Sequence, residues 1–273
     1  MTGVKAWVIS GFVYLALVIA GYSLITGANP LASGEMHHVD HQEDNHGKGH
    51  GHNDHSYHPN DSEVLTEVSY KDGKLVVSVK DIEGTVLELR ETHERLMHII
   101  VVSDDLEEYY HFHPVEVGEG IFEVDASLEG GHYFVFVDIV PKGKEYVTYP
   151  ITLEIGDHSH EDMVSPNLMA DDNLLQTVNG KEVELVYSNL TAGEHVTLAF
   201  DLKDDTPLPY LGALGHVVII DERIEQFIHV HPISHDETIF DAHFPSPGKY
   251  KLWAEFKFEE TGVLVFPFVI EVE

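Results

Sequence analysis

The sequence predicts an all-β protein with two tandem antiparallel β-sandwich domains behind one N-terminal transmembrane helix. Three observations support this class. Residues 63–273 consist of short β-branched and aromatic runs separated by turn residues, and no helical period of useful length intervenes. The pattern of these runs restarts after a polar stretch at 158–179, which indicates a duplicated domain. A long uncharged apolar segment precedes both copies.

Residues 1–33 are predicted to anchor the chain in a membrane. No charged residue occurs from Ala6 to Gly34, and Trp7–Thr26 is a nearly unbroken apolar run. A helix of roughly 20 such residues spans a bilayer. Lys5 precedes the run and acidic residues follow it, so the positive-inside rule predicts a single-pass cell-membrane protein with its N-terminus in the cytoplasm and its domains outside. The alternative is a cleaved signal peptide and a secreted product; the length of the run and the nearby Pro30 favour the anchor.

The composition excludes several classes of partner and chemistry. The chain has 15 Lys and Arg residues against 48 Asp and Glu residues, a formal net charge of −33. Nucleic-acid binding is therefore excluded, because it needs cationic side chains that release counterions from phosphates. Cysteine is absent, so disulfides, thiolate metal sites, iron–sulfur clusters and thiol catalysis are excluded as well. The 21 histidines outnumber Lys and Arg together and are the unusual feature of the composition.

Residues 34–62 are predicted to form a disordered, histidine-rich tether. Almost no apolar residue is available there to build a core. Histidines among carboxylates favour low-affinity capture of divalent metal ions over a plain polar spacer, which is usually built from other residues. These histidines are His37, His38, His41, His46, His50, His52, His55 and His58.

The two predicted sandwiches, residues 63–157 and 180–273, are copies of one domain. Met97–Pro114 aligns with Gly215–Pro232 without a gap, at a constant offset of 215 − 97 = 118. Upstream of this segment the copies diverge, and 158–179 is predicted to link them.

Each copy retains three histidines at one spacing, which predicts a three-nitrogen metal site in each sandwich. Alternate residues of a strand share one face, and a hairpin with an even loop brings the first histidine to that face as well. A register slip of one residue would place it on the opposite face. The alternative is a buried, hydrogen-bonded imidazole network that stabilises the sandwich. The triads are His98, His111 and His113 in the first copy and His216, His229 and His231 in the second.

An acidic residue is retained near both triads, as Asp138 and Glu255 at an offset of 255 − 138 = 117. It is expected to ligate the metal directly or to accept a hydrogen bond from a ligand histidine, and the alternative is a solvated strand residue. Nitrogen and carboxylate ligands without thiolates favour Cu(II), with Zn(II) next, and argue against a Cu(I) site. Five histidines that occur in one copy only are expected to be polar surface residues: His93, His132, His195, His235 and His243.

The segments Met97–Pro114 and Pro209–Pro232, each ending in a His-x-His-Pro motif, resemble bacterial extracytoplasmic proteins with YtkA-like domains. The resemblance covers about residues 64–273 and implies immunoglobulin-like β-sandwiches, membrane-attached or secreted, that handle copper or other heavy metals. It implies no catalytic site. The chain is similar in kind to copper-binding sandwiches of the CopC type, but it does not match the N-terminal histidine motif of that family.

The sequence therefore predicts a membrane-anchored, extracytoplasmic protein that binds copper or zinc ions. It would capture, buffer or deliver the metal, with a metal transporter or a metalloenzyme as partner. The alternative is a non-catalytic structural or interaction module of tandem immunoglobulin-like domains. No enzyme is expected, because the chain has no P-loop, GxSxG or dinucleotide motif; a copper-dependent oxidoreductase is the enzymatic alternative.

Overall fold

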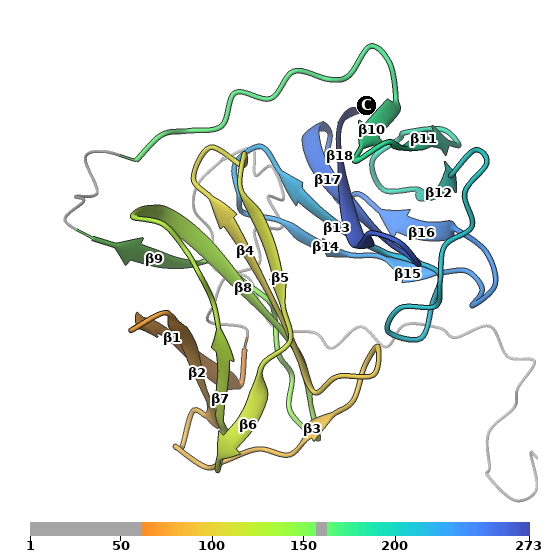
Figure 1. Ribbon diagram of the computed structural model, residues 1–273. Helices are drawn as coiled ribbons and strands as arrows, with labels where there is room; N and C mark the ends of the chain where they lie inside the picture. Colours follow the sequence, from red (N-terminus) through yellow and green to blue (C-terminus); the bar gives the residue numbers. More distant parts are fainter. Residues whose placement is uncertain (1–61, 157–162) are drawn as a thin grey trace, which may run out of the picture. The chain divides into compact units, whose positions relative to one another are not determined.

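The computed structural model describes residues 62–156 and 163–273 (Figure 1). The expected membrane anchor, the eight histidines of the expected tether and residues 157–162 lie outside the described residues. Within the described ranges every regular element is a β-strand, and no helix there is long and apolar enough to cross a membrane. These ranges belong to one compact unit, Asp54–Glu273.

The first repeat is an antiparallel β-sandwich. One sheet has the strand order β1-β2-β7-β6, and the other has the order β3-β8-β4-β5 with β9 paired to β8. The strands are β1 (Val64–Lys71), β2 (Lys74–Asp81), β3 (Leu89–Arg90), β4 (Met97–Ser103), β5 (Tyr109–Phe112), β6 (Val115–Gly118), β7 (Ile121–Asp125), β8 (Gly131–Pro141) and β9 (Ile151–Ile155).

The second repeat has the same two-sheet design, with orders β10-β11-β12-β16-β15 and β14-β13-β17-β18. Its first strand lies inside the segment expected as a linker. The strands are β10 (Leu175–Val178), β11 (Lys181–Tyr187), β12 (His195–Asp201), β13 (His216–Asp221), β14 (Phe227–His229), β15 (His231–Pro232), β16 (Ile239–His243), β17 (Gly248–Phe258) and β18 (Gly262–Val272).

Most strands coincide with the apolar runs of the sequence, and the exceptions have physical reasons. β6 has only four residues and all are exposed, so its alternating Val115 and Val117 bury no face. The run Thr85–Leu89 also predicts a strand, and this prediction is wrong except for its last residue. Val86 forms only an isolated bridge with Lys80. Short edge strands are held mainly by backbone hydrogen bonds, and these bonds leave little trace in side-chain periodicity.

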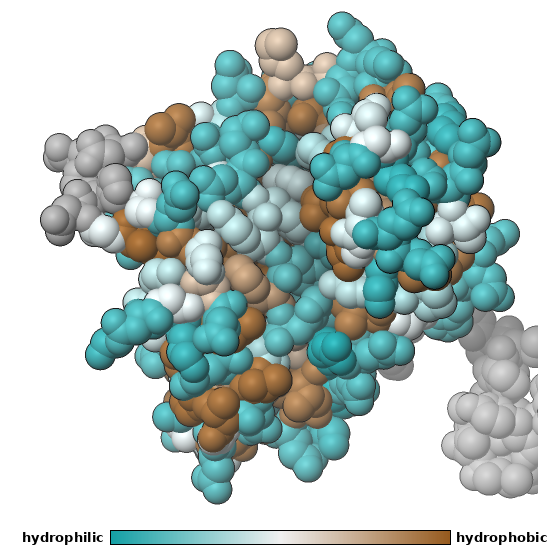
Figure 2. Space-filling view, in the orientation of Figure 1, coloured by the Kyte–Doolittle hydropathy of each residue, from teal (hydrophilic) through white to brown (hydrophobic). Residues whose placement is uncertain are grey.

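Each sandwich has its own hydrophobic core. In β2, Leu75, Val77 and Val79 alternate with more exposed residues and are at most 1% exposed. A third of the buried residues of the second core are aromatic, including Phe256 and Phe268, which are fully buried. The large apolar residues are thus mostly inside, and the visible surface is mainly hydrophilic with small brown groups (Figure 2).

A third core cluster joins the two repeats. Along β4, Ile99 and Val101 face the core of the first sandwich, whereas Ile100 and Val102 pack in a cluster that also contains residues of the second repeat. Because β4 and the equivalent β13 are buried on both faces, their sequences are continuous apolar runs rather than alternating ones. The residues contributed by the second repeat include Val218, Ile220, Ile224 and Trp253.

The two repeats dock through equivalent surfaces. Tyr109 stacks on Trp253 at 4.9 Å between ring centroids, and Phe136 stacks on Phe227 at 5.3 Å. Tyr109 is equivalent to Phe227 by the offset of 118, and Phe136 is equivalent to Trp253 by the offset of 117. Exchanging equivalent residues of the two repeats therefore turns one contact into the other, as in the reciprocal interface of a two-fold dimer.

Candidate metal centre

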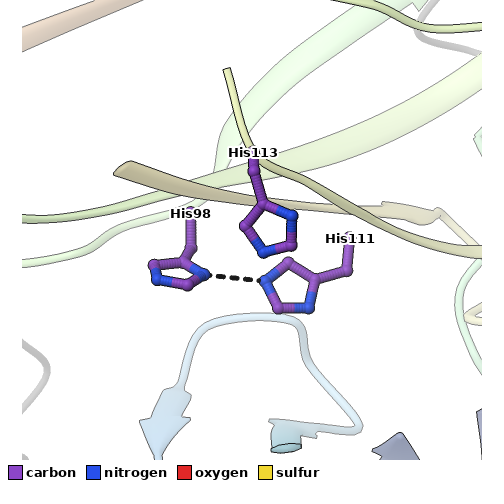
Figure 3. Close-up of side chains that lie close together, drawn as sticks. All are labelled: His98, His111 and His113. Atoms are coloured by element: carbon purple, nitrogen blue, oxygen red, sulfur yellow. Dashed lines mark hydrogen bonds between the residues drawn. The ribbon is translucent and has the colours of Figure 1, made fainter. Parts of the chain in front are cut away.

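The three histidines of the first triad lie together. Their candidate ligand nitrogens are all within 4.8 Å of one another (Figure 3). In the β4–β5 ladder, Ile100 pairs with His111 and Ile99 with Phe112, a register in which position 98 lies across from position 113. His98, His111 and His113 thus share one face of the sheet, which confirms the predicted even register.

Both nitrogens of the His98 ring have a neighbour at hydrogen-bond distance. Nε2 lies 3.0 Å from the backbone oxygen of Thr92, and Nδ1 lies 3.0 Å from Nε2 of His111. A carbonyl oxygen only accepts, so Nε2 of His98 carries a proton. In a neutral ring Nδ1 then holds a lone pair, which is directed at His111.

The His111 ring is fixed in the opposite sense. Its Nδ1 lies 3.0 Å and 3.1 Å from the two carboxylate oxygens of Glu255, so Nδ1 donates a hydrogen bond and Nε2 holds the lone pair of the neutral ring. Two lone pairs therefore face each other across the 3.0 Å between His98 and His111. With these tautomers, a cation between the rings, either a proton or a metal ion, would bind both lone pairs.

His113 distinguishes these two cations. Its Nε2 is buried and has no hydrogen-bond partner. Burial, reinforced by the neighbouring His111 and His98, lowers the pKa of His113 to about 3, so this ring stays neutral at physiological pH. A proton shared by His98 and His111 leaves Nε2 of His113 unsatisfied, whereas a metal ion would use all three nitrogens.

The spacing suits a metal ion. With metal–nitrogen bonds of about 2.0 Å, two nitrogens 3.0 Å apart subtend roughly 90–100° at the ion, which is compatible with tetrahedral or tetragonal coordination. A cavity of about 30 Å³ adjoins the rings, and a space of this size holds about one water molecule. Its lining includes His93, Asp138 and His216.

The retained acidic residues occupy equivalent positions. Asp138 pairs with His98 in the β4–β8 ladder, and Glu255 pairs with His216 in the β13–β17 ladder. The alternative of a solvated strand residue is wrong for Glu255, which is 2% exposed. Its carboxylate contacts His111 of the other repeat, so of the two expected roles it has that of hydrogen-bond acceptor. The sequence did not indicate that this contact crosses between the copies.

The second triad is described only in part. His216 is 9% exposed, and its Nε2 donates to the backbone oxygen of Tyr210 at 3.1 Å, as His98 does to Thr92. Burial lowers the pKa of His216 to about 3. The side chains of His229 and His231 lie outside the described residues, so the second metal site remains a prediction.

The turn before each first histidine is also repeated. Thr92 forms an isolated bridge with Arg95, and Tyr210 forms one with Ala213, at the same offset of 118. The copies are therefore equivalent further upstream than their sequences suggest, and in both repeats a turn carbonyl orients the first histidine.

The His-x-His-Pro motif marks the place where the chain changes sheets. β5 ends at Phe112 and β6 begins at Val115 in the opposite sheet; in the second repeat β14 and β15 also lie in different sheets. His111 is thus held by its ladder, and His113 by the crossover.

Among the histidines expected at the surface, one is buried and one is half-buried. His132 is only 6% exposed, and His93 lines the cavity with its ring centroid 5.9 Å from that of His98. His93 has a left-handed φ of 48° in the repeated turn, and no sequence pattern indicated its proximity to the triad. The expectation holds for the exposed residues His195, His235 and His243.

A family model described as a domain of unknown function (DUF8832) matches residues 66–156 and 176–273, one range in each repeat. The chain belongs to this family. A comparison with curated proteins finds no match. The expected relationship to YtkA-like proteins therefore remains a prediction.

Solved structures match the chain at low similarity. A two-domain fibronectin type III segment of chicken tenascin is 11% identical with a TM-score of 0.26, over 78% of this chain and 100% of that one. The Escherichia coli adhesin FdeC is 14% identical with a TM-score of 0.24, over 78% and 65%. The Yersinia pseudotuberculosis adhesin InvE is 10% identical with a TM-score of 0.19, over 81% and 61%. The match thus spans less than two thirds of each adhesin chain, and at these scores it carries no argument about function.

Proposed function

We propose that the triad of the first repeat binds a divalent metal ion, Cu(II) in preference to Zn(II), and that the protein captures, buffers or delivers this metal outside the cytoplasm. One observation carries the proposal. Nitrogens of His98, His111 and His113 converge, and no placement of protons on neutral rings satisfies all three. A metal ion held by three imidazoles satisfies them together.

The ligand set supports a borderline metal ion. Imidazole suits copper and zinc, and at equal availability Cu(II) binds more tightly than Zn(II). A thioether ligand, which would favour Cu(I), is not supplied by Met97, because this side chain is fully buried in the core of the first sandwich. Thr92 and Glu255 hold the outer nitrogens of two ligands, the usual arrangement around ligating histidines.

A binding role fits the site better than a catalytic one. The adjoining cavity of about 30 Å³ has room for a water-sized ligand but not for an organic substrate, whose pockets usually measure ~300–1,000 Å³. In this proposal the triad stores or transfers the metal ion. The N-terminal segment attaches the chain to the membrane, and the histidines before residue 62 collect metal at low affinity. A metal transporter or a metalloenzyme would receive it.

Electron paramagnetic resonance of the first equivalent of Cu(II) tests the proposal. We expect superhyperfine coupling to three nitrogens in the wild-type chain and to fewer in His113→Ala. The matched control is His195→Ala, because the His195 side chain is 80% exposed and is not part of the triad. A spectrum unchanged by His113→Ala would contradict the proposal and favour a structural imidazole network in an interaction module.

The metal-free protein should lose stability in mild acid. His113 and His216 have pKa values of about 3 in the folded chain, and an unfolded histidine has a pKa near 6.5. Between these values the unfolded chain binds more protons, so the free energy of unfolding falls as the pH drops from about 6.5 towards 3. The slope is up to about 1.4 kcal/mol per pH unit for each histidine.

Urea unfolding in the presence of a chelator, at several pH values, measures this slope. The double variant His113→Gln, His216→Gln should show a smaller change of the unfolding free energy with pH. Equal slopes for both chains would refute this prediction.

A further inference from the structure

We infer that the metal site of the first repeat is completed by the second repeat through Glu255, so that metal binding and the docking of the two repeats strengthen each other. This inference rests on the proposed metal binding and extends it to a regulatory coupling. The contact that carries it joins residues 144 positions apart, His111 on β5 and Glu255 on β17.

The buried carboxylate of Glu255 has its hydrogen bonds in the other repeat. It accepts from Nδ1 of His111 at 3.0 Å and from the hydroxyl of Tyr109 at 2.9 Å, and both donors belong to the first repeat. Burial alone would raise the pKa of Glu255, but the neighbouring His111 and the bonds from His111 and Tyr109 together hold it below the ordinary value. The carboxylate therefore remains charged beside the triad.

Glu255 acts on the metal through His111. By accepting the Nδ1 proton it fixes the tautomer that leaves Nε2 available, and a carboxylate partner raises the basicity of a ligand imidazole. A metal ion on Nε2 in turn withdraws electron density from the ring and makes the Nδ1–H group a stronger donor to Glu255. Coupling of this kind is reciprocal, so the ion tightens the contact between the repeats by the same factor.

Other contacts keep the repeats docked without involving the triad. The shared apolar cluster contains the Tyr109–Trp253 stack, and Lys251 pairs with Glu107 across the repeats at 3.0 Å. The two repeats therefore stay docked without metal, and metal binding would strengthen the contact between them.

The first experiment compares metal affinity in full-length chains by competition with a chelator. Glu255→Gln keeps the size of the side chain and removes its charge, and we expect a 10- to 100-fold loss of Cu(II) affinity, the usual effect of losing an outer partner of a ligand. The matched controls are Lys251→Met, which removes a contact between the repeats away from the triad, and Glu271→Gln on the exposed end of β18. Both controls should bind within about twofold of the wild type.

The second experiment removes two ligands of the second triad, so that an effect on the second repeat must pass through the contact between the repeats. Hydrogen exchange of the chain carrying His229→Ala and His231→Ala, with and without Zn(II), should show added protection in β13 and β17 as well as in β4 and β5. Unchanged affinity in Glu255→Gln, or protection confined to the first repeat, would overturn the inference while leaving metal binding intact. A wild-type chain that binds no metal at the triad would instead overturn the proposed function.

Discussion

Replacing His111 by alanine is expected to abolish tight metal binding. His111 is the central residue of the triad: its Nε2 faces His98 at 3.0 Å, and its Nδ1 is held by Glu255. Loss of a residue that is hydrogen-bonded to a ligand typically lowers metal affinity 10- to 100-fold. Loss of a ligand itself should cost more, so we expect the Cu(II) dissociation constant to rise more than 100-fold. A competition titration with a chromophoric chelator measures this change, and any weak binding before residue 62 is common to all chains.

Two controls make the His111→Ala result specific. His195→Ala removes an exposed imidazole that also neighbours a carboxylate, Asp241 at 3.0 Å, and it should leave the affinity unchanged. His229→Ala removes the equivalent residue of the second repeat, and its effect will show whether the second triad contributes. Affinity of His111→Ala within about twofold of the wild type would exclude this triad as the site.

Replacing Trp253 by alanine is expected to destabilise the chain strongly and to uncouple the unfolding of its two repeats. Trp253 is 2% exposed, lies in the cluster shared by the repeats, and stacks on Tyr109 at 4.9 Å. Truncation of a buried aromatic residue costs about 3–5 kcal/mol. Because this side chain bridges the repeats, we expect the wild type to unfold in one transition and Trp253→Ala to unfold in two.

Phe268→Ala is the matched control for Trp253. Phe268 is fully buried in the core of the second repeat and does not belong to the shared cluster. Its loss should destabilise that repeat by a comparable amount without loosening the docking. Urea unfolding followed by circular dichroism compares the two chains. A single transition in Trp253→Ala with the wild-type midpoint would show that the shared cluster contributes little.

Most of the fold could be predicted from the sequence, because apolar and polar residues alternate with a period of two along strands that have one buried face. β2 and β16 are examples, with alternating burial along each strand. Edge strands such as β6 could not be predicted, since an exposed strand of four residues is too short for its periodicity to be recognised. The continuous apolar runs of β4 and β13 contained the sign of a second packed face, but not the identity of the surface that covers it.

The candidate site divides in the same way. Duplication alone identified His98, His111 and His113, because two diverged copies retained one spacing, and strand geometry placed them on one face. The sequence also identified the acidic position of Asp138 and Glu255. It did not indicate His93, the carbonyl of Thr92 or the hydroxyl of Tyr109, since their roles depend on turn conformation and on packing between the repeats.

The sequence by itself determined that this chain is a duplicated β-sandwich with a histidine triad in each copy. Only the tertiary structure decided that the carboxylate bonded to His111 of the first triad comes from the second repeat. The physical reason is the reciprocal docking of the two copies: it brings Glu255 to His111 across 144 residues, and no local pattern in either copy records which faces meet.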